Sequence, residues 1–173
     1  MGPDVDETNA VLIVVGSHLR AEERDRPLAY GLKKRIEHWR EMHADQLDVP
    51  LTPLVCSDLW YLNHQDLQRR PTICIGGPGV NALAAINANQ SDTEAEDIPD
   101  TSEDMTEPEG SSIESDEIQP RVTIMIDPDF THLRVGVWGT DTELTEKGLQ
   151  LFCDRYLDDY LRACVTQVEP KTD

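Results

Sequence analysis

Three short segments of the sequence carry residue types that bind ligands or do chemistry. They are Gly16-Ser17-His18, Ser57-Asp58, and Gly76-Gly77-Pro78-Gly79 with Asn81. Each segment follows an apolar run that is typical of a strand. Glycines let the backbone turn sharply and approach another group closely, and the unpaired amides of a helix's first turn point at whatever lies there. The three segments therefore predict a site for a small polar or phosphorylated, nucleotide-like ligand.

The same segments contain residues that could act in catalysis. Asp58 could serve as a base or a cation ligand, with Ser17 or His18 assisting, which predicts a hydrolase or transferase as an alternative function. Asp58 and His18 are equally typical of helix caps. The sequence contains no GxSxG, GxGxxG or GxxxxGK[ST] pattern, and no HExxH or Cys/His ligand spacing. We therefore predict no metal site and name no cofactor.

The elements that must position these segments alternate along the chain. Apolar runs predict strands, and apolar residues at helical spacing predict helices, in the order strand 10–15, helix 25–43, strand 51–56, helix 62–69, strand 72–75, helix 80–89. In the first helix, Asp25 is expected to cap and Pro27 to lie in the first turn. This order favours a parallel sheet, in which ligands bind at the carboxyl ends of the strands. We therefore expect the three segments at one edge.

Two further strands, at 122–126 and 133–138, are separated by a short connection, so one of them must run antiparallel. We expect 122–126 to be parallel, which adds Asp127 to the site and places Gly139–Asp141 at the opposite edge. The reverse arrangement would exchange these two assignments. A last helix follows Thr140. The sequence thus predicts an α/β fold: a single three-layer Rossmann-like or flavodoxin-like domain, with a mainly parallel sheet of about five strands and one antiparallel edge strand.

The charge is unevenly distributed. The chain has 34 acidic and 15 basic residues, a net charge of -19, and twelve of the acids fall within 91–118, where there is no Lys or Arg. Such a composition predicts a disordered insertion. The expected organisation is a disordered tail at 1–9, one discontinuous domain at 10–90 and 120–166, the acidic insertion at 91–119, and a tail at 167–173. The insertion supports a third hypothesis, an interaction protein that binds a basic partner.

Composition also excludes some partners and compartments. An acidic chain is a poor match for duplex nucleic acid or an anionic membrane surface, which are bound by clustered Lys and Arg. No apolar run approaches the roughly 20 residues needed to cross a bilayer, and the amino-terminal segment is too acidic for a signal peptide. The four cysteines form no CxxC pair, and Cys56 and Cys74 fall in apolar runs, as reduced thiols do. We expect a cytoplasmic protein.

The glycine turn Gly76-Gly-Pro-Gly-Val-Asn81 resembles the GGPxxN turn of an archaeal surface-layer domain family. It is also similar to the glycine turn of the LOG-type phosphoribohydrolases and related nucleotide-sensing Rossmann-like proteins. Either resemblance covers about six residues. In the second family the motif is PGGxGTxxE, and aligning its glycines places Ile75, Val80 and Leu83 where that motif has Pro, Thr and the catalytic Glu. What this resemblance implies is a nucleotide-like ligand at the turn.

Overall fold

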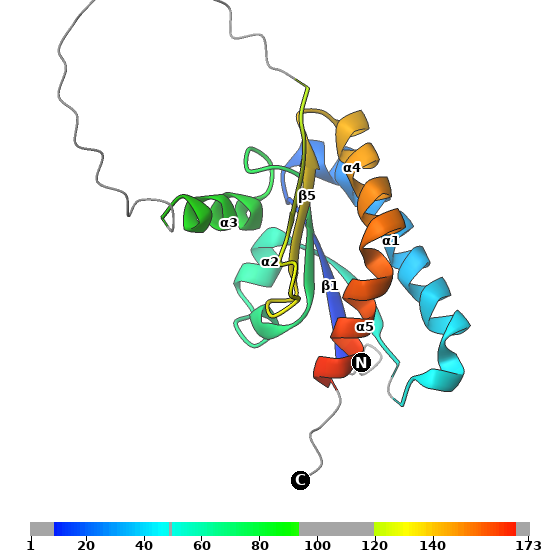
Figure 1. The fold of residues 1–173 in the computed structure, drawn as a ribbon. Helices are drawn as coiled ribbons and strands as arrows, with labels where there is room; N and C mark the ends of the chain where they lie inside the picture. The colour runs from blue at the N-terminus through cyan, green and yellow to red at the C-terminus, as the bar shows by residue number, and fades with distance from the viewer. Residues whose placement is uncertain (1–8, 49, 94–119, 169–173) are drawn as a thin grey trace, which may run out of the picture.

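The protein forms a five-stranded sheet with helices on both faces, as seen in a computed structural model that describes residues 9–48, 50–93 and 120–168 (Figure 1). The elements along the chain are β1 (Ala10–Val15), α1 (Leu19–Met42), η2 (Ala44–Gln46), β2 (Thr52–Ser57), α2 (Asp58–Leu62), η3 (Leu67–Arg69), β3 (Thr72–Ile75), α3 (Ala82–Thr93), β4 (Val122–Ile126), β5 (Arg134–Gly139), α4 (Thr142–Arg155) and α5 (Leu157–Val168). The strand order is β2-β1-β3-β5-β4. The predicted α/β fold, mainly parallel with one antiparallel edge strand, is confirmed.

The domain extends slightly beyond the expected bounds. Asn9, predicted in the tail, is buried, and α3 continues to Thr93. At the other end, α5 continues to Val168. The predicted disordered tails and acidic insertion fall mostly on residues 1–8, 94–119 and 169–173, which lie outside the described residues.

The central strand β1 is apolar on both faces because helices cover both of its sides. Its six residues are all buried, and they alternate between two hydrophobic clusters. Val11, Ile13 and Val15 face α1, α4 and α5, whereas Leu12 and Val14 face α2 and α3. This period-two alternation under helices on both faces explains why the run shows no polar positions.

The direction of the last two strands differs from our expectation. β5 pairs with β3 in parallel, and β4 pairs with β5 antiparallel at the edge. The expectation that 122–126 is parallel is therefore wrong: the carboxyl end of β5 leads to the predicted site, whereas Asp127 lies at the opposite end of the sheet. Burial provides the reason, because Val135–Val137 of β5 are buried and fit the interior position, whereas every β4 residue is only half-buried.

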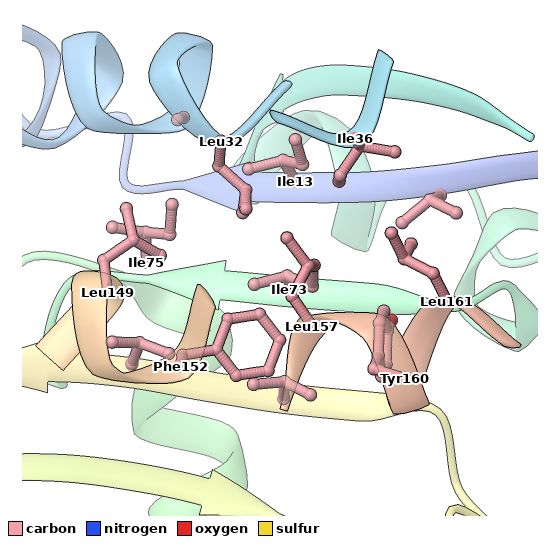
Figure 2. Packing of buried hydrophobic residues seen from close by; sticks show 14 of the residues in the cluster. Ile13, Leu32, Ile36, Ile73, Ile75, Leu149, Phe152, Leu157, Tyr160 and Leu161 are labelled. Atoms are coloured by element: carbon pink, nitrogen blue, oxygen red, sulfur yellow. The ribbon is translucent and has the colours of Figure 1, made fainter. Parts of the chain in front are cut away.

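The larger core lies between the sheet and α1, α4 and α5 (Figure 2). Leu32 and Ile36 of α1 face the isoleucines of β1 and β3. On the same face of the sheet, α4 and α5 add large side chains to this core. Phe152 and Tyr160 meet edge to face with ring centroids 6.0 Å apart. The buried Tyr160 hydroxyl donates a 3.1 Å hydrogen bond to the Leu133 carbonyl, so its polar end is satisfied.

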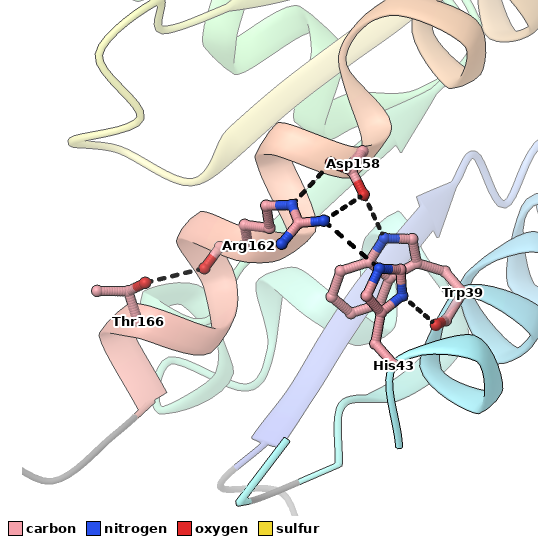
Figure 3. A network of polar contacts seen from close by, with 5 residues as sticks. All are labelled: Trp39, His43, Asp158, Arg162 and Thr166. Carbon is pink, nitrogen blue, oxygen red and sulfur yellow. Dashed lines mark hydrogen bonds and ion pairs between the residues drawn. The ribbon is translucent and has the colours of Figure 1, made fainter. Parts of the chain in front are cut away.

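A polar network joins the carboxyl-terminal part of α1 to α5 (Figure 3). The Trp39 indole nitrogen donates to Asp158 at 2.7 Å, and the Arg162 guanidinium donates to the same carboxylate at 2.7 Å. The Trp39 and His43 rings stack with centroids 4.4 Å apart. These exposed contacts connect α1 and α5 outside the apolar core.

Two helices begin at earlier residues than the sequence predicted. α1 begins at Leu19, capped by His18, whose Nδ1 accepts from the Arg20 amide at 3.2 Å. Consequently Asp25 is not a cap, and Pro27 lies inside the helix. α2 begins at Asp58 directly after β2, several residues before the expected helical segment, and Ser57 is its cap. α2 follows β2 directly, whereas Gly16, Ser17 and His18 separate α1 from β1.

The opposite face of the sheet is only partly covered. α2 and α3 pack over β1, β2 and β3, with Tyr61, Leu67 and Leu83 buried beneath them. Beyond β3, the α3 side of β5 and β4 presents Arg134, Gly136 and Met125, which line a hollow together with Asn87 of α3.

Two helical glycines provide a matched test of this packing. A β-carbon at Gly31 in α1 would meet nothing within 4 Å, whereas one at Gly148 in α4 would lie 2.8 Å from Val122. Gly31→Ala should raise the free energy of unfolding by about 0.5–1 kcal/mol, because alanine loses less entropy in a helix. Gly148→Ala should lower it by roughly 1–2 kcal/mol, because overpacking outweighs that gain. Urea denaturation measures both, and equal effects would contradict the packing of α4 on β4.

Candidate functional site

The three predicted segments lie together at the carboxyl edge of the sheet. β1, β2 and β3 are parallel and in register, with Val15 opposite both Ser57 and Ile75. Gly16–His18, Ser57–Asp58 and Gly76–Asn81 follow from these positions. The reversal of strand order lies here as well, because the chain passes from β1 to β2 on one side and then to β3 on the other.

The Asp58 carboxylate joins these segments. Oδ1 accepts from the Ser17 amide at 2.9 Å, from the Ser17 hydroxyl at 2.7 Å and from the Leu59 amide at 2.7 Å. Oδ2 accepts from the Ala82 amide, at the start of α3, at 2.7 Å. One carboxylate therefore ties together the chain after β1, the start of α2 and the start of α3.

These contacts define the chemical state of Asp58. The side chain is 3% exposed, and its burial alone would raise its pKa, but the hydrogen bonds from Ala82, Ser17 and Leu59 outweigh burial and hold the pKa below its ordinary value. A carboxylate has about four lone-pair sites, and four donors already occupy them. The residue is thus an ionised cross-link with little capacity left to accept a substrate proton.

Asn81 forms a second cross-link beside the first. Its side-chain nitrogen donates to the carbonyls of Val14 at 3.4 Å and Ile75 at 3.0 Å. Its side-chain oxygen accepts from the amides of Leu83 at 3.0 Å and Ala84 at 3.4 Å. The side chain is 1% exposed, so it holds β1, β3 and α3 together from within and does not face solvent.

The glycines allow the turn after β3 to fold back over β1. A β-carbon at Gly16 would lie 1.8 Å from the Val80 carbonyl oxygen, so only glycine permits this contact. Gly76 has a φ of +99°, a conformation that side-chain-bearing residues rarely adopt. Part of the gap between β1 and β3 is therefore filled by the backbone of the turn, whose tip at Pro78 and Gly79 is exposed.

Asp25 reaches this edge from α1, and the sequence reasoning did not assign it to the site. It belongs to the buried face of α1, in the series Ala21, Asp25, Ala29, Leu32 and Ile36. Its side chain is 6% exposed, and its Oδ2 lies 2.6 Å from the position of a β-carbon at Gly76. No described residue donates a hydrogen bond to it, and its oxygens reach solvent, because no fully enclosed side-chain oxygen of the described residues lacks a partner. Burial raises its pKa, and the nearby Arg24 only partly opposes this.

Other donors lie near Asp25. Arg24 is exposed and donates a long 3.5 Å hydrogen bond to the Thr142 hydroxyl at the start of α4, next to the exit of β5. No described residue accepts a hydrogen bond from the amides of Gly77 or Gly79. The edge therefore offers one buried acid and several donors, which is a set suited to a ligand that carries both hydroxyl or amine groups and an anionic group.

The remaining predicted candidates have clear structural positions. His18 is exposed at the cap of α1, and Ser17 is exposed with its hydroxyl committed to Asp58. Pro78 and Gly79 form the tip of the turn after β3. Asp141 caps α4 by accepting from the Leu144 amide at 2.8 Å, at the same edge. The Asp127 carboxylate, at the opposite end, accepts from the His132 amide at 2.9 Å.

Cysteine and metal chemistry find no support in the described part of the chain. The thiols are free, and burial raises the pKa of Cys56 to about 11 and the pKa values of Cys74 and Cys164 to about 12. Such thiols stay protonated and poorly nucleophilic. Within residues 9–48, 50–93 and 120–168, no group of three or more His, Cys, Asp or Glu side chains is placed to hold a metal ion.

None of the described helices combines the length and apolarity that crossing a membrane requires. The chain matches no protein-family model, no curated protein and no solved structure.

Asp58→Asn tests the cross-link at the edge. The amide retains one acceptor and presents an NH₂ group to a backbone donor, so the free energy of unfolding should fall by about 2–4 kcal/mol.

The pH dependence of stability should change as well. Because the folded pKa of Asp58 is lowered from 3.8, its contribution is present above that value and is lost as pH falls below it. Urea denaturation between pH 7 and pH 3 should show a flatter profile in the variant, and the exposed Asp66→Asn provides the control.

Asp25→Asn should have the opposite effect. Because the folded pKa of Asp25 is raised above 3.8, stability falls as pH rises from that value through the folded pKa. The amide that replaces the carboxyl group carries no charge, so the substitution should raise the melting temperature at pH 7 and leave it nearly unchanged at pH 4. A loss of stability at pH 7 would show that the carboxylate has a partner that stabilises its charge.

Proposed function

We propose that the protein binds a small polar or phosphorylated, nucleotide-like ligand at the carboxyl edge of the sheet, around Gly76, Gly77 and Gly79. The single observation that carries the proposal is the buried Asp25 carboxyl group, which has no hydrogen-bond donor among the described residues. No fully enclosed side-chain oxygen of the described residues lacks a hydrogen-bond partner, so the Asp25 oxygens are open to solvent at this edge. A largely buried acid that is reachable beside a glycine turn, at a strand-order reversal, is typical of a binding site.

The chemistry of the edge suggests how such a ligand would be held. Asp25 would accept from a hydroxyl or amine group, as acidic residues do with ribose hydroxyls in dinucleotide-binding folds. The Arg24 guanidinium and the amides of Gly77 and Gly79 would donate to an anionic group such as a phosphate. The ligand would thus satisfy the acid and the donors together.

The hydrogen bonds of Asp58 support binding in preference to a hydrolase or transferase that uses Asp58 as its base. A general base needs a free lone pair and a pKa near the working pH. Asp58 accepts four hydrogen bonds from the protein, and its pKa is lowered. Its position instead suits a residue that holds the surrounding segments in place.

A thermal-shift screen tests the proposal. Nucleosides, nucleotides and sugar phosphates at millimolar concentration should include at least one compound that raises the melting temperature of the full chain. Asp25→Asn should weaken that compound's affinity by about tenfold or more, the effect expected when one charge-assisted hydrogen bond is lost. Because the same substitution is expected to stabilise the free protein, weaker binding would not reflect unfolding.

Two further variants locate the ligand. Gly79→Val adds bulk where a β-carbon meets nothing within 4 Å, so it should block the ligand without disturbing the fold. Gly31→Ala, remote on α1, should leave the affinity unchanged. The proposal fails if no compound stabilises the protein, or if a compound binds Asp25→Asn and Gly79→Val as well as it binds the unaltered chain.

A further inference from the structure

A concave surface lies at the opposite end of the sheet from the carboxyl edge. A hollow of about 580 Å³ opens between η3, α3 and the uncovered face of β4 and β5, near the amino ends of β3 and β5. Its walls include Gln68 and Arg69 before β3, His132 and Arg134 at the start of β5, and Met125 and Gly136 on the sheet. This volume is within the roughly 300–1,000 Å³ typical of small-molecule sites.

The alternation of β5 explains why the sheet is hollowed here. Val135 and Val137 point into the core, so Arg134, Gly136 and Trp138 lie on the opposite face. Gly136 contributes no side chain between the arginine and the tryptophan, and its partner on β4 is Met125. A β-carbon at Gly136 would lie 2.9 Å from the Trp138 ring and 3.7 Å from Met125 Cβ. The Trp138 ring therefore packs against Gly136, and with Met125 it forms a shallow apolar patch that has Arg134 beside it.

The lining is basic although the chain is acidic. Arg69, Arg70, Arg134 and His132 line the hollow, and no acidic residue of the described ranges does. These arginines are three of only 15 Lys and Arg residues in a chain with 34 acids. In the described part of the chain, Arg69 and Arg134 pair with no carboxylate; Arg134 donates to the Gln68 carbonyl at 2.9 Å, which holds it against η3. Asp66 and Asp127 lie outside this lining, although Asp66 shares an adjoining hollow with Arg69 and Arg70, and the Asp127 carboxylate accepts from the backbone amide of His132.

We propose that this hollow is a binding site for a small organic anion of about nucleotide size. Its phosphate or carboxylate would be held by Arg69 and Arg134, since guanidinium groups bind such anions through paired hydrogen bonds. Its apolar body would lie over Gly136 and against Met125. The protein's overall negative charge repels anions, so Arg69 and Arg134, which pair with no carboxylate among the described residues, are where an anion would be retained.

This site is separate from the carboxyl edge. Asp25, Gly77 and Gly79 do not line the hollow, and Arg69 and Arg134 lie at the opposite ends of the strands. The two proposals can therefore fail independently, and variants of one site serve as controls for the other.

The experiment uses ¹⁵N-labelled full chain and three probes: 1-naphthyl phosphate, neutral 1-naphthol and inorganic phosphate. We expect 1-naphthyl phosphate at millimolar concentration to shift the backbone amide signals of Gly136 and Met125, and to bind more tightly than either of the other two. Arg69→Gln and Arg134→Gln should each weaken it about tenfold, whereas Arg155→Gln on α4, an exposed residue with the same loss of charge, should not.

Two outcomes would contradict the proposed anion site. Absence of shifts at Gly136 and Met125, or equal weakening in Arg155→Gln, would overturn the assignment and indicate non-specific attraction of an anion. Arg69 is exposed and has no partner in the described ranges, so its variant keeps the fold even if Arg134→Gln disturbs η3. Asp25→Asn should leave the naphthyl phosphate affinity unchanged, and a loss there would place the probe at the carboxyl edge instead.

Discussion

The carboxyl edge depends on the four hydrogen bonds that the Asp58 carboxylate accepts. Three chain segments leave the sheet in different directions after β1, β2 and β3, and without a common acceptor each would expose backbone donors in a partly buried space. Asp58 accepts from all three, and Asn81 joins the carbonyls of β1 and β3 beneath it. Removing a buried acceptor leaves its donors unpaired, which costs more than the bond itself contributes. This connection is why the glycine turn can pack so closely on β1.

Asp25 and Asp58 show how environment assigns different roles to the same residue type. Both are almost fully buried at one edge of the sheet. Asp58 receives four donors and has a lowered pKa, whereas Asp25 receives none from the described residues and has a raised pKa. A largely buried carboxyl group without protein donors costs stability, and groups with perturbed pKa values cluster at functional sites. The comparison favours Asp25 as the group that meets a ligand and Asp58 as the group that shapes the site.

Much of this fold could be predicted from the sequence because the strands are short apolar runs and alternate with helices. β1, β2 and β3 and the shared edge follow from that order and from the rule for parallel sheets. Asp25 was missed because the first helix was placed to begin there, which made the residue a cap. His18 is an uncommon cap, so the earlier start had no strong signal. Had the helix been extended back to Leu19, an acid would have appeared within the apolar series Ala21, Ala29, Leu32 and Ile36.

The directions of β4 and β5 depend on which of two strands is more buried, and that is decided by tertiary packing.

Trp138 links the carboxyl edge to the basic hollow and determines which substitutions can distinguish them. Its ring lies 3.2 Å from the position of a β-carbon at Gly77, at the carboxyl edge, and 2.9 Å from that of one at Gly136, in the basic hollow. A side chain added at either glycine must displace the same indole, so its effect would reach both regions. Asp25 on α1 and Arg69 on η3 come from different elements and lie on opposite sides of this ring along the strands. Substitutions at these two positions change the charge in one region only, which makes them the sharper probes of where a ligand binds.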